Sequence, residues 1–286
     1  HNVVGMKNSI VLNTGAPVGD FYVWGSAISG NRHMYVNSSS VTLCMTISNV
    51  ESMRFSNNGG SNWSSWIPYS VIFPWTITGD GLKTIDAEFK TNAGTTTSSS
   101  ISITLDTTSP SITGFVINNG DATANSTSAE LDYTYTEAND LWAQYINDGS
   151  SWSSQDALAA GTSVPVNKNW ALRAATGTRT VSARLTDIAG NVSALYSDDI
   201  YLNTVAPGLP DVTIASFVNT LRPAWSWPAV TGASQYRIQL DTTTGTWSNI
   251  GDVLNWAPDY DLSPGSHILY VQAGDIANNW SNTASA

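Results

Sequence analysis

Apolar and polar residues alternate along three similar stretches of the chain, 84–97, 180–193 and 268–281. Each stretch carries three apolar residues at alternate positions before a turn: Ile85, Ala87 and Phe89; Val181, Ala183 and Leu185; Leu269, Val271 and Ala273. A period of two predicts a half-buried β-strand. Asp187 and Asp275 then accept hydrogen bonds from the backbone of a turn, so each stretch predicts a strand, a tight turn and a return strand.

The stretch recurs about every 90 residues, a spacing typical of tandem β-domains. Three junctions share one pattern, in which a strand ends at Asn or Asp and a short bridge containing Thr leads to a proline. We name them the N-terminal junction (9–17), the middle junction (102–110) and the last junction (199–207). Proline fixes φ and disfavours helix in the preceding residue, so these bridges are predicted to be short and stiff.

The junctions divide the chain into an N-terminal piece and three domains, with boundaries near Thr14, Thr107 and Thr204. We expect residues 1–14 to be the end of an upstream domain or an N-terminal arm, followed by unit 1 (15–107), unit 2 (108–204) and unit 3 (205–286). The number of strands and their spacing of about 8 to 12 residues favour sandwiches of two sheets over closed barrels. The predicted fold is all-β, a tandem array of antiparallel β-sandwich domains.

The net charge and the length of the apolar runs limit which partners we expect. The chain has 11 Lys and Arg against 22 Asp and Glu, a formal net charge of −11. No basic stripe is available to follow a phosphate backbone, so we expect no nucleic-acid partner. No apolar run approaches the roughly 18 residues of a membrane span and no signal peptide opens the chain, so we expect no membrane insertion. Cys44 is the sole cysteine and is interpreted as an unreactive thiol.

Several motifs resemble known repeats. The run Asp-x-Ala-Gly-Asn at 187–191, the bridge after Leu105 and the run SNNGGSNWSSWIPY at 56–69 are similar to immunoglobulin-like repeats of large secreted and surface proteins of bacteria. Unit 3 looks closer to fibronectin type III, through the strand with Trp225 and Trp227. The resemblance covers nearly the whole chain. It implies secretion or a cell-surface location, and further domains of a longer polypeptide as neighbours, which the abrupt start at His1 also suggests.

Signs of catalysis are scarce. The sequence contains no GxSxG, HExxH, phosphate-binding glycine loop or CxxC, and it has only three histidines. Carboxylate pairs such as Asp198 with Asp199 lack a predicted cleft to hold them apart on either side of a substrate. We therefore expect a protein that is not an enzyme.

Aromatic residues offer the first candidate site, since 12 tryptophans stand among 286 residues. One Trp recurs after the middle turn of each unit, as Trp63, Trp152 and Trp247, and is interpreted as structural, filling the space between sheets or locking the hairpin. The aromatic residues without a counterpart in other units are candidates for stacking on a glycan or another cell-surface ligand: Trp66, Tyr69, Trp75, Trp256 and Trp280.

Calcium is the second candidate. Asp106 in the middle junction and Asp187 and Asp275 in late turns are hard oxygen donors near domain ends, where cations often stiffen arrays of the kind this chain resembles. Asp148 in a middle turn is a further donor. Asp106 is matched by Asn13 and Asn203 in the other junctions, and each loss of charge weakens a calcium site. The alternative is that each Asp only caps its own turn.

Two function classes remain open. The first is a stalk or spacer of a bacterial surface or secreted protein such as an adhesin, because acidic faces rich in Thr and Ser keep strand edges soluble. The second is a module that binds glycan or a cell-surface ligand through exposed aromatic residues, as an adhesin tip or an accessory domain of a polysaccharide-degrading enzyme. The two differ in whether the aromatic residues without counterparts face solvent together.

Overall fold

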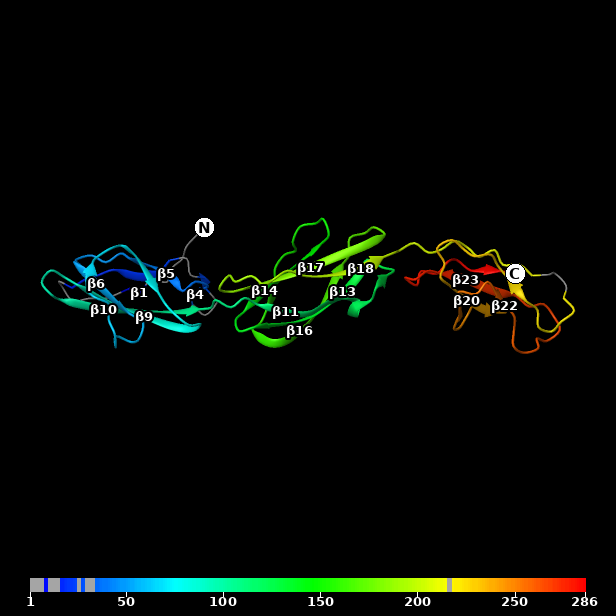
Figure 1. Ribbon diagram of the computed structural model, residues 1–286, viewed down its shortest axis with the longest axis horizontal. Coiled ribbons are helices and arrows are strands. Elements are labelled where there is room, and N and C mark those ends of the chain that lie inside the picture. The colour runs from blue at the N-terminus through cyan, green and yellow to red at the C-terminus, as the bar shows by residue number, and fades with distance from the viewer. Residues whose placement is uncertain (1–7, 10–15, 25–26, 29–33, 215–217) are drawn as a thin grey trace.

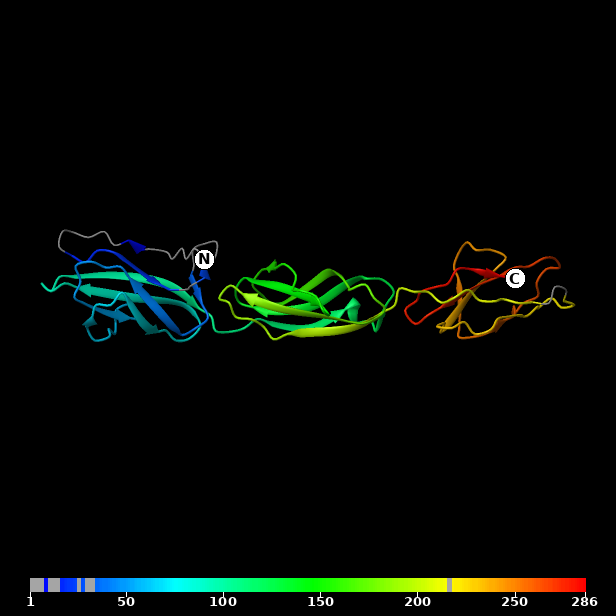
Figure 2. The same ribbon diagram turned by 90° about the horizontal axis from the view of Figure 1, so that it is seen from above.

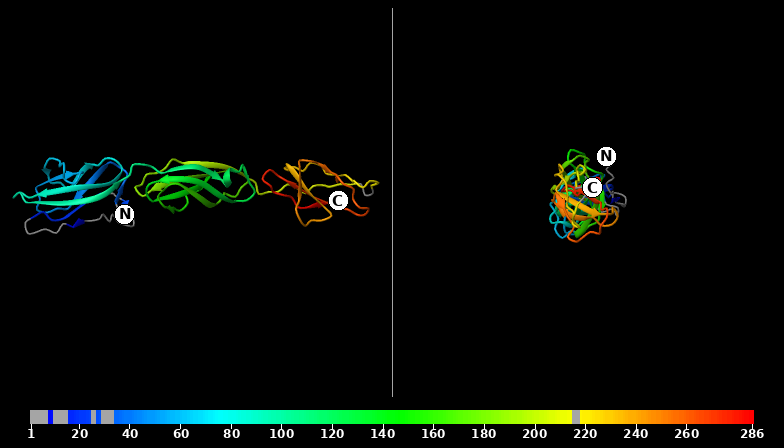
Figure 3. Two further views of the ribbon diagram at one scale, coloured as in Figure 1. Left: turned by 90° about the horizontal axis from the view of Figure 1, so that it is seen from below. Right: turned by 90° about the vertical axis from the view of Figure 1, so that its right-hand side faces the viewer.

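The fold is all-β. The computed structural model describes residues 8–9, 16–24, 27–28, 34–214 and 218–286. The strands form three successive pairs of sheets, which lie in a row along the long axis (Figure 1). Seen down that axis the three groups overlap, so the row is nearly straight (Figure 3). None of the helical structure in the described part has the length and apolar character needed to cross a bilayer.

The described residues of unit 1 form nine strands, and β1 from the preceding piece joins them, in two sheets of order β1-β2-β5-β8 and β3-β4-β10-β9-β6-β7. Their bounds are β1 (Asn8–Ser9), β2 (Asp20–Val23), β3 (Ala27–Ile28), β4 (Met34–Val36), β5 (Ser40–Met45), β6 (Ser52–Ser56), β7 (Ile67–Pro68), β8 (Ile72–Thr76), β9 (Gly81–Lys90) and β10 (Thr96–Leu105). The boundary predicted at Thr14 lies outside the described residues. Of the piece 1–14, the structure describes only β1, which pairs with β2.

Unit 2 has sheets of order β11-β13-β16 and β12-β18-β17-β14-β15. Its elements are β11 (Ser111–Ile117), the 3₁₀-helix η1 (Asn118–Gly120), β12 (Thr123–Ala124), β13 (Ser128–Glu137), β14 (Leu141–Asn147), β15 (Asp156–Leu158), β16 (Gly161–Ala171), β17 (Gly177–Asp187) and β18 (Tyr196–Leu202). Figure 2 shows the two layers of this unit from above.

Unit 3 has shorter strands, in sheets of order β19-β22 and β21-β20-β23-β24. They are β19 (Trp225–Ser226), β20 (Gln235–Leu240), β21 (Ser248–Gly251), β22 (Asn255–Trp256), β23 (Leu269–Gly274) and β24 (Ala284–Ser285).

Three hydrophobic cores fill the spaces between the paired sheets, one in each unit. The nine alternating apolar residues predicted to face inward, on β9, β17 and β23, are all 0 % exposed: Ile85, Ala87, Phe89, Val181, Ala183, Leu185, Leu269, Val271 and Ala273. The predicted inward faces are therefore confirmed, because successive side chains of a strand point to opposite faces of its sheet.

Among the described strands, two pairs run parallel within otherwise antiparallel sheets. In unit 1, β4 pairs parallel with β10, setting Tyr35 opposite Thr104. In unit 2, β12 pairs parallel with β18, setting Thr123 opposite Tyr201. In each case a short strand near the start of the unit is bonded to the strand that leaves it. An early strand and the exit strand of each of these units are thereby joined inside one sheet.

In four hairpins, a serine after the turn makes the same two hydrogen bonds to a residue of the preceding strand. Ser64 donates its N–H to the Phe55 carbonyl at 2.8 Å, while its hydroxyl accepts from the Phe55 N–H at 3.0 Å. The same reciprocal pair links three further serines to a strand residue: Ser153 to Tyr145, Ser193 to Leu185 and Ser281 to Ala273. The hydroxyl replaces a carbonyl as acceptor, so pairing continues where the chain bends away from the ladder.

Candidate metal centre

Three carboxylates from different parts of the fold converge where unit 2 meets the middle junction. Asp106 directly follows β10, Glu137 ends β13, and Asp187 ends β17. One oxygen of each lies within 4.8 Å of the other two. The three side chains are 5 %, 5 % and 1 % exposed, respectively. The middle junction thus brings together the predicted donors Asp106 and Asp187 and adds a third.

The spacing and chemistry of this group fit calcium. Oxygen ligands bind Ca²⁺ at about 2.3 to 2.6 Å, so two ligands on opposite sides of one ion lie at most about 5 Å apart. Three hard carboxylates supply the charge that a tight calcium site requires, and bidentate binding would give up to about six oxygens. The residues present therefore fit the ion that the resemblance implies.

Asparagine side chains hold the carboxylates in place. Asn139 donates from its side-chain amide to Asp106 Oδ2 at 2.6 Å, and from its main-chain N–H to Glu137 Oε1 at 3.0 Å. Asn191 donates from Nδ2 to Asp187 Oδ2 and to the Asp106 carbonyl, both at 2.8 Å. Because a carboxylate oxygen has two lone pairs, these bonds leave capacity for a cation. The same asparagines therefore fix the junction and orient its donors.

Burial affects the pKa of Glu137 within this group. It raises the pKa of Glu137, and the neighbouring Asp106 and Asp187 carboxylates raise it further, against the opposing effect of the Asn139 N–H. A cation placed among the three oxygens would offset both burial and repulsion and lower the pKa of Glu137.

The last junction repeats this arrangement of hydrogen bonds with an amide in place of one carboxylate donor. Asn203 takes the position of Asp106 and donates from Nδ2 to Asp275 Oδ2 at 2.7 Å. Asn279, at the position of Asn191, donates to Asp275 Oδ2 at 2.9 Å and to the Asn203 carbonyl at 2.7 Å. Asp275, the third predicted calcium donor, therefore lies apart from the other two. The Asp275 carboxylate accepts hydrogen bonds from amide N–H groups, and residue 203 supplies no second carboxylate beside it.

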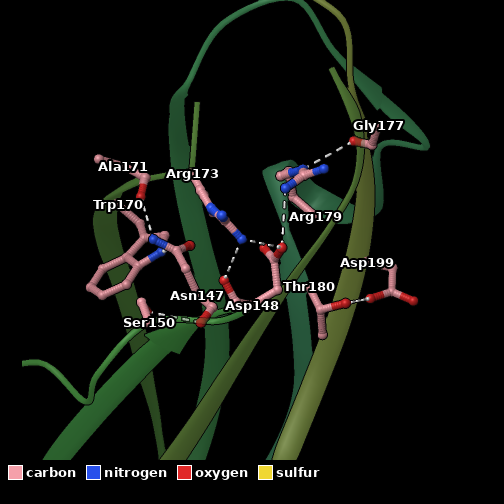
Figure 4. A network of polar contacts seen from close by, with 10 residues as sticks. All are labelled: Asn147, Asp148, Ser150, Trp170, Ala171, Arg173, Gly177, Arg179, Thr180 and Asp199. Atoms are coloured by element: carbon pink, nitrogen blue, oxygen red, sulfur yellow. Dashed lines mark hydrogen bonds and ion pairs between the residues drawn. The ribbon is translucent and has the colours of Figure 1, made fainter. Parts of the chain in front are cut away.

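Asp148 belongs to a different network, shown in Figure 4. Its Oδ2 lies 3.0 Å from Arg179 Nη1 and 3.7 Å from Arg173 Nη1. The guanidinium groups occupy the position a cation would take, and they tie the end of β14 to the start of β17. Asp148 is accordingly an ion-pair partner within unit 2.

Trp66 and Trp280, two of the predicted ligand-binding aromatics, stack on cations. The Arg54 guanidinium lies between Trp63 and Trp66, 4.8 and 4.7 Å from their ring centroids, and Lys90 covers Trp66 at 4.2 Å. Trp280 lies 4.2 Å from Arg237. A stacked cation occupies the ring face that a sugar would use.

Tyr69, Trp75 and Trp256, the other three, pack against their cores. The Tyr69 hydroxyl accepts from the Ile47 N–H at 2.9 Å. Trp75 donates from Nε1 to Asn57 Oδ1 at 2.6 Å, and its ring lies 5.4 Å from that of Phe55. Trp256 lies 5.8 Å from Trp225. All five predicted aromatics are half-buried, and they are divided between units 1 and 3, so they do not form one strip.

The recurring tryptophans lie outside the three cores, which corrects the expectation that they fill the space between sheets. Trp152 stacks on Arg184 at 4.2 Å and Trp247 on Arg237 at 5.1 Å, matching Trp63 on Arg54. Each is followed by Ser, and Ser64 and Ser153 are two of the hairpin-closing serines. The hairpin-locking interpretation fits these contacts.

Glu137 is the donor that the sequence reasoning missed. It lies in phase with the apolar residues Leu131, Tyr133 and Tyr135 of β13, so alternation places it on the buried face. A carboxylate at an inward position costs several kcal/mol unless it is paired or bound to a cation. An acidic residue at an inward position of an alternating apolar strand therefore indicates a carboxylate that needs a charged partner or a cation. This pattern could have identified Glu137 from the sequence.

These features define a protein built of tandem β-sandwich domains. No protein-family model and no curated protein sequence matches the chain. Similar solved structures are tandem fibronectin type III and immunoglobulin-like domains. The FN1–FN3 domains of chicken CNTN1 are 12 % identical at a TM-score of 0.41, over 96 % of this chain and 99 % of that one.

Bacterial proteins occur among the similar structures. Fibronectin(III)-like modules of Clostridium thermocellum CbhA are 12 % identical at a TM-score of 0.41, over 64 % of this chain and 94 % of theirs. A segment of a 1.5-MDa bacterial ice-binding adhesin is 13 % identical at a TM-score of 0.38, over 94 % and 96 %. At these identities the likeness concerns the fold.

Proposed function

We propose that this chain is a non-catalytic extension segment of a bacterial surface or secreted protein, a stalk whose three domains hold other parts of a longer polypeptide at a distance. The domains correspond to units 1, 2 and 3, with boundaries near Thr107 and Thr204. Support comes from three separate cores in a row and from polar contacts across both short junctions.

The observation that carries the proposal is the bonding of the middle and last junctions to the units that follow them. Asn191 bonds the carbonyl of residue 106, and Asn279 bonds the carbonyl of residue 203, so both bridges are fixed in the same manner. On the other side, Asp80 of unit 1 accepts from the Thr107 hydroxyl at 2.9 Å and the Thr108 hydroxyl at 3.0 Å. Flexible linkers have no such bonds, so a stiff spacer is the arrangement they support.

Calcium has a defined part in this proposal. Asp106, Glu137 and Asp187 would hold it, joining the end of unit 1 to two strands of unit 2. The ion supplies charge compensation and a cross-link between the domains. Secreted and surface-exposed proteins meet millimolar calcium, the range in which extracellular sites bind.

Small-angle X-ray scattering of the whole chain tests the stalk. With calcium, we expect a rod-like profile with one maximum dimension. Removal of calcium with EDTA should broaden the distribution of distances between units 1 and 2, while the Asn279→Ala variant should loosen units 2 and 3 whether calcium is present or not. A broad, composite distribution in every condition would contradict a stiff spacer.

The glycan-binding alternative has weaker support, because cations cover Trp66 and Trp280 and cores hold Tyr69, Trp75 and Trp256. A panel of glycans and polysaccharides, run with calcium and with EDTA, decides between the two. Binding that is lost in Trp66→Ala or Trp256→Ala, with the fold intact, would favour a recognition module over a spacer.

A further inference from the structure

One tryptophan of unit 1 lies mostly in solvent. All 12 tryptophans of the chain fall within the described residues, and all but one are buried or half-buried. The exception is Trp24, which directly follows β2 and is 58 % exposed. It is none of the five aromatic residues predicted to bind a ligand. Because an indole ring gains free energy when it leaves water, a ring held in solvent marks a surface that a ligand can cover.

The strand register places other apolar side chains beside Trp24. The Trp24 N–H donates to the Thr42 carbonyl at 2.9 Å, so the pairing of β2 with β5 continues past Val23. Thr42 is itself paired with Pro74 of β8, which sets Trp24, Thr42 and Pro74 in one row across three strands. The neighbouring row, two residues along the strands, consists of Tyr22, Cys44 and Ile72. Alternate residues of a strand share a face, so both rows lie on the face turned away from the core.

This outer face is apolar, and none of the residues in the two rows is charged. Ile72 is 57 % exposed, and Pro74 is exposed as well. Burial raises the pKa of the Cys44 thiol, against the opposing effect of a side-chain hydrogen bond with Tyr22. The Tyr22 side chain therefore reaches across to β5 and lies along the sheet, half-buried beside the exposed indole.

Polar residues border the two rows at either end. Beyond Tyr22, the Thr46 hydroxyl accepts from the Asp20 main-chain N–H at 3.3 Å. Beyond Trp24, Ser40 pairs with Thr76, and both residues are exposed. An apolar centre with hydroxyl groups around it suits a ligand that has apolar faces and hydrogen-bonding edges.

Area and charge indicate the class of ligand. A stable protein interface takes about 800 Å² from each partner. A large side chain presents at most about 250 Å², so Trp24 and Ile72, at 58 % and 57 % exposed, together offer less than about 300 Å². A sugar ring is small enough for such a patch, and its C–H face stacks on the negative face of an aromatic ring. The net charge of −11 repels acidic polymers but not neutral ones.

We propose that Trp24, with Tyr22, Ile72 and Pro74, forms a lateral binding site on unit 1 for a neutral polysaccharide. Sugar rings stack on the indole and cover the two aliphatic side chains, while their hydroxyl groups bond to Thr42 and to the bordering polar rows. The site goes beyond the spacer role and does not depend on it, because it lies on one face of one domain and uses neither the junctions nor calcium.

Affinity electrophoresis of the whole chain in native gels tests the site. The neutral probes are xylan, galactomannan, hydroxyethylcellulose and mixed-linkage β-glucan, and the acidic probe is alginate. We expect at least one neutral polymer to retard the parent chain, and alginate to leave its mobility unchanged. Trp24→Ala should weaken binding at least about tenfold, whereas Trp24→Phe, which keeps an aromatic ring, should retain part of it.

Two exposed aliphatic residues of unit 1 provide a matched pair of variants. Ile72→Asp sets a charge within the proposed site and should weaken binding. Leu82→Asp, at a 62 % exposed residue of β9 in the other sheet, should leave binding unchanged. Both side chains lie largely in solvent, so each variant should keep the calorimetric transition of unit 1.

Fluorescence quenching follows the ring itself. Oligosaccharides of the bound polymer should shield part of the tryptophan emission from acrylamide in the parent, and should not do so in Trp24→Ala. Retardation by none of the neutral polymers, or equal retardation of the parent and Trp24→Ala, would overturn the site. Self-association that Trp24→Ala abolishes, with no polymer bound, would overturn the polysaccharide as occupant in favour of a second copy.

Discussion

Asn203 donates a hydrogen bond from its side-chain amide to the carboxylate of Asp275, with 2.7 Å between Nδ2 and Oδ2. At the middle junction the same position is Asp106, which has no proton to give to Asp187. One junction is thus closed by an amide, and the other gathers carboxylates whose repulsion a cation can relieve. The difference of one side chain predicts different responses of the two junctions to calcium.

Asp106→Asn should abolish the response of unit 2 to calcium. In the parent, free calcium at a hundredfold excess over its Kd stabilises the folded state by about 2.7 kcal/mol. For a domain of this size that corresponds to a shift in unfolding temperature on the order of 10 °C. Differential scanning calorimetry with calcium and with EDTA measures it. If calcium raised the unfolding temperature of the variant as much as that of the parent, the ion would bind at another site.

Asn203→Asp is the reciprocal change, and it provides the control. It removes the amide donor and sets a half-buried carboxylate beside the buried Asp275, so we expect unit 3 to lose about 1 to 3 kcal/mol in EDTA. If calcium restored part of the lost stability of unit 3, the result would support the view that the last junction can bind calcium once it carries the carboxylate found at the middle junction. A neutral effect would show that the amide pair contributes little.

Glu137→Gln should alter the dependence of stability on pH. The folded-state pKa of Glu137 lies above its ordinary value of 4.5, so the fold favours the protonated acid. In EDTA that contribution is fully present below pH 4.5 and is lost as the pH rises through the folded-state pKa. The Gln variant should therefore be the more stable protein in EDTA at pH 7, and the less responsive one to calcium. Urea titrations from pH 4 to 8 measure both.

Val181→Asp should unfold unit 2 and leave the others folded. Val181 is 0 % exposed, and an unpaired charge at such a position costs several kcal/mol. Calorimetry should lose one transition and retain those of units 1 and 3. A single cooperative transition that disappears altogether would argue against separate domains.

Ser153→Ala tests the serine that closes the second hairpin. The change removes the acceptor of the buried Tyr145 N–H, a bond of 3.0 Å, and we expect a cost of about 1 to 3 kcal/mol. Ser151→Ala, two residues away at an exposed position, should change stability by less than about 0.5 kcal/mol. Equal effects of the two substitutions would mean that the hydroxyl is dispensable.

His267→Gln should flatten a pH response in unit 3. Charged His267 donates to the Asp241 carboxylate at 2.6 Å and to the Ser263 carbonyl at 2.8 Å, and these bonds hold the pKa of His267 above its ordinary 6.5. The charged form is thus favoured in the fold, and its contribution is present below pH 6.5 and lost as the pH rises through the folded-state pKa. The unfolding temperature of unit 3 should fall between pH 6 and 9 in the parent, and less in the variant.

The sequence was sufficient to predict the fold class and the inward faces, because period two in a strand fixes which side chains share a face. Alternation identified Val181, Ala183 and Leu185 as buried without knowledge of the partner strands. It placed Asp106 and Asp187 near domain ends, but their meeting with Glu137 depends on how β13 packs beside the junction. No local pattern encodes that approach.

The contacts of the tryptophans could not be predicted from the sequence. Composition marks them as unusual, yet what each ring touches depends on strand register across the sheet. Trp152 meets Arg184 because β14 and β17 pair with Gln144 opposite Arg184. In unit 1 the arginine stands on β6 itself, as Arg54. The same outer-face stack is thus built from different strands, and only the pairing reveals it.

The parallel pairing of β4 with β10 and of β12 with β18 determines how the molecule bears tension. When a stalk is pulled at its two ends, force enters a unit near its first strands and leaves through its last. The bonds of the parallel pair lie across that direction, so they are loaded in shear and must break together rather than one at a time. In a stalk, units 1 and 2 would therefore resist pulling at this parallel pair.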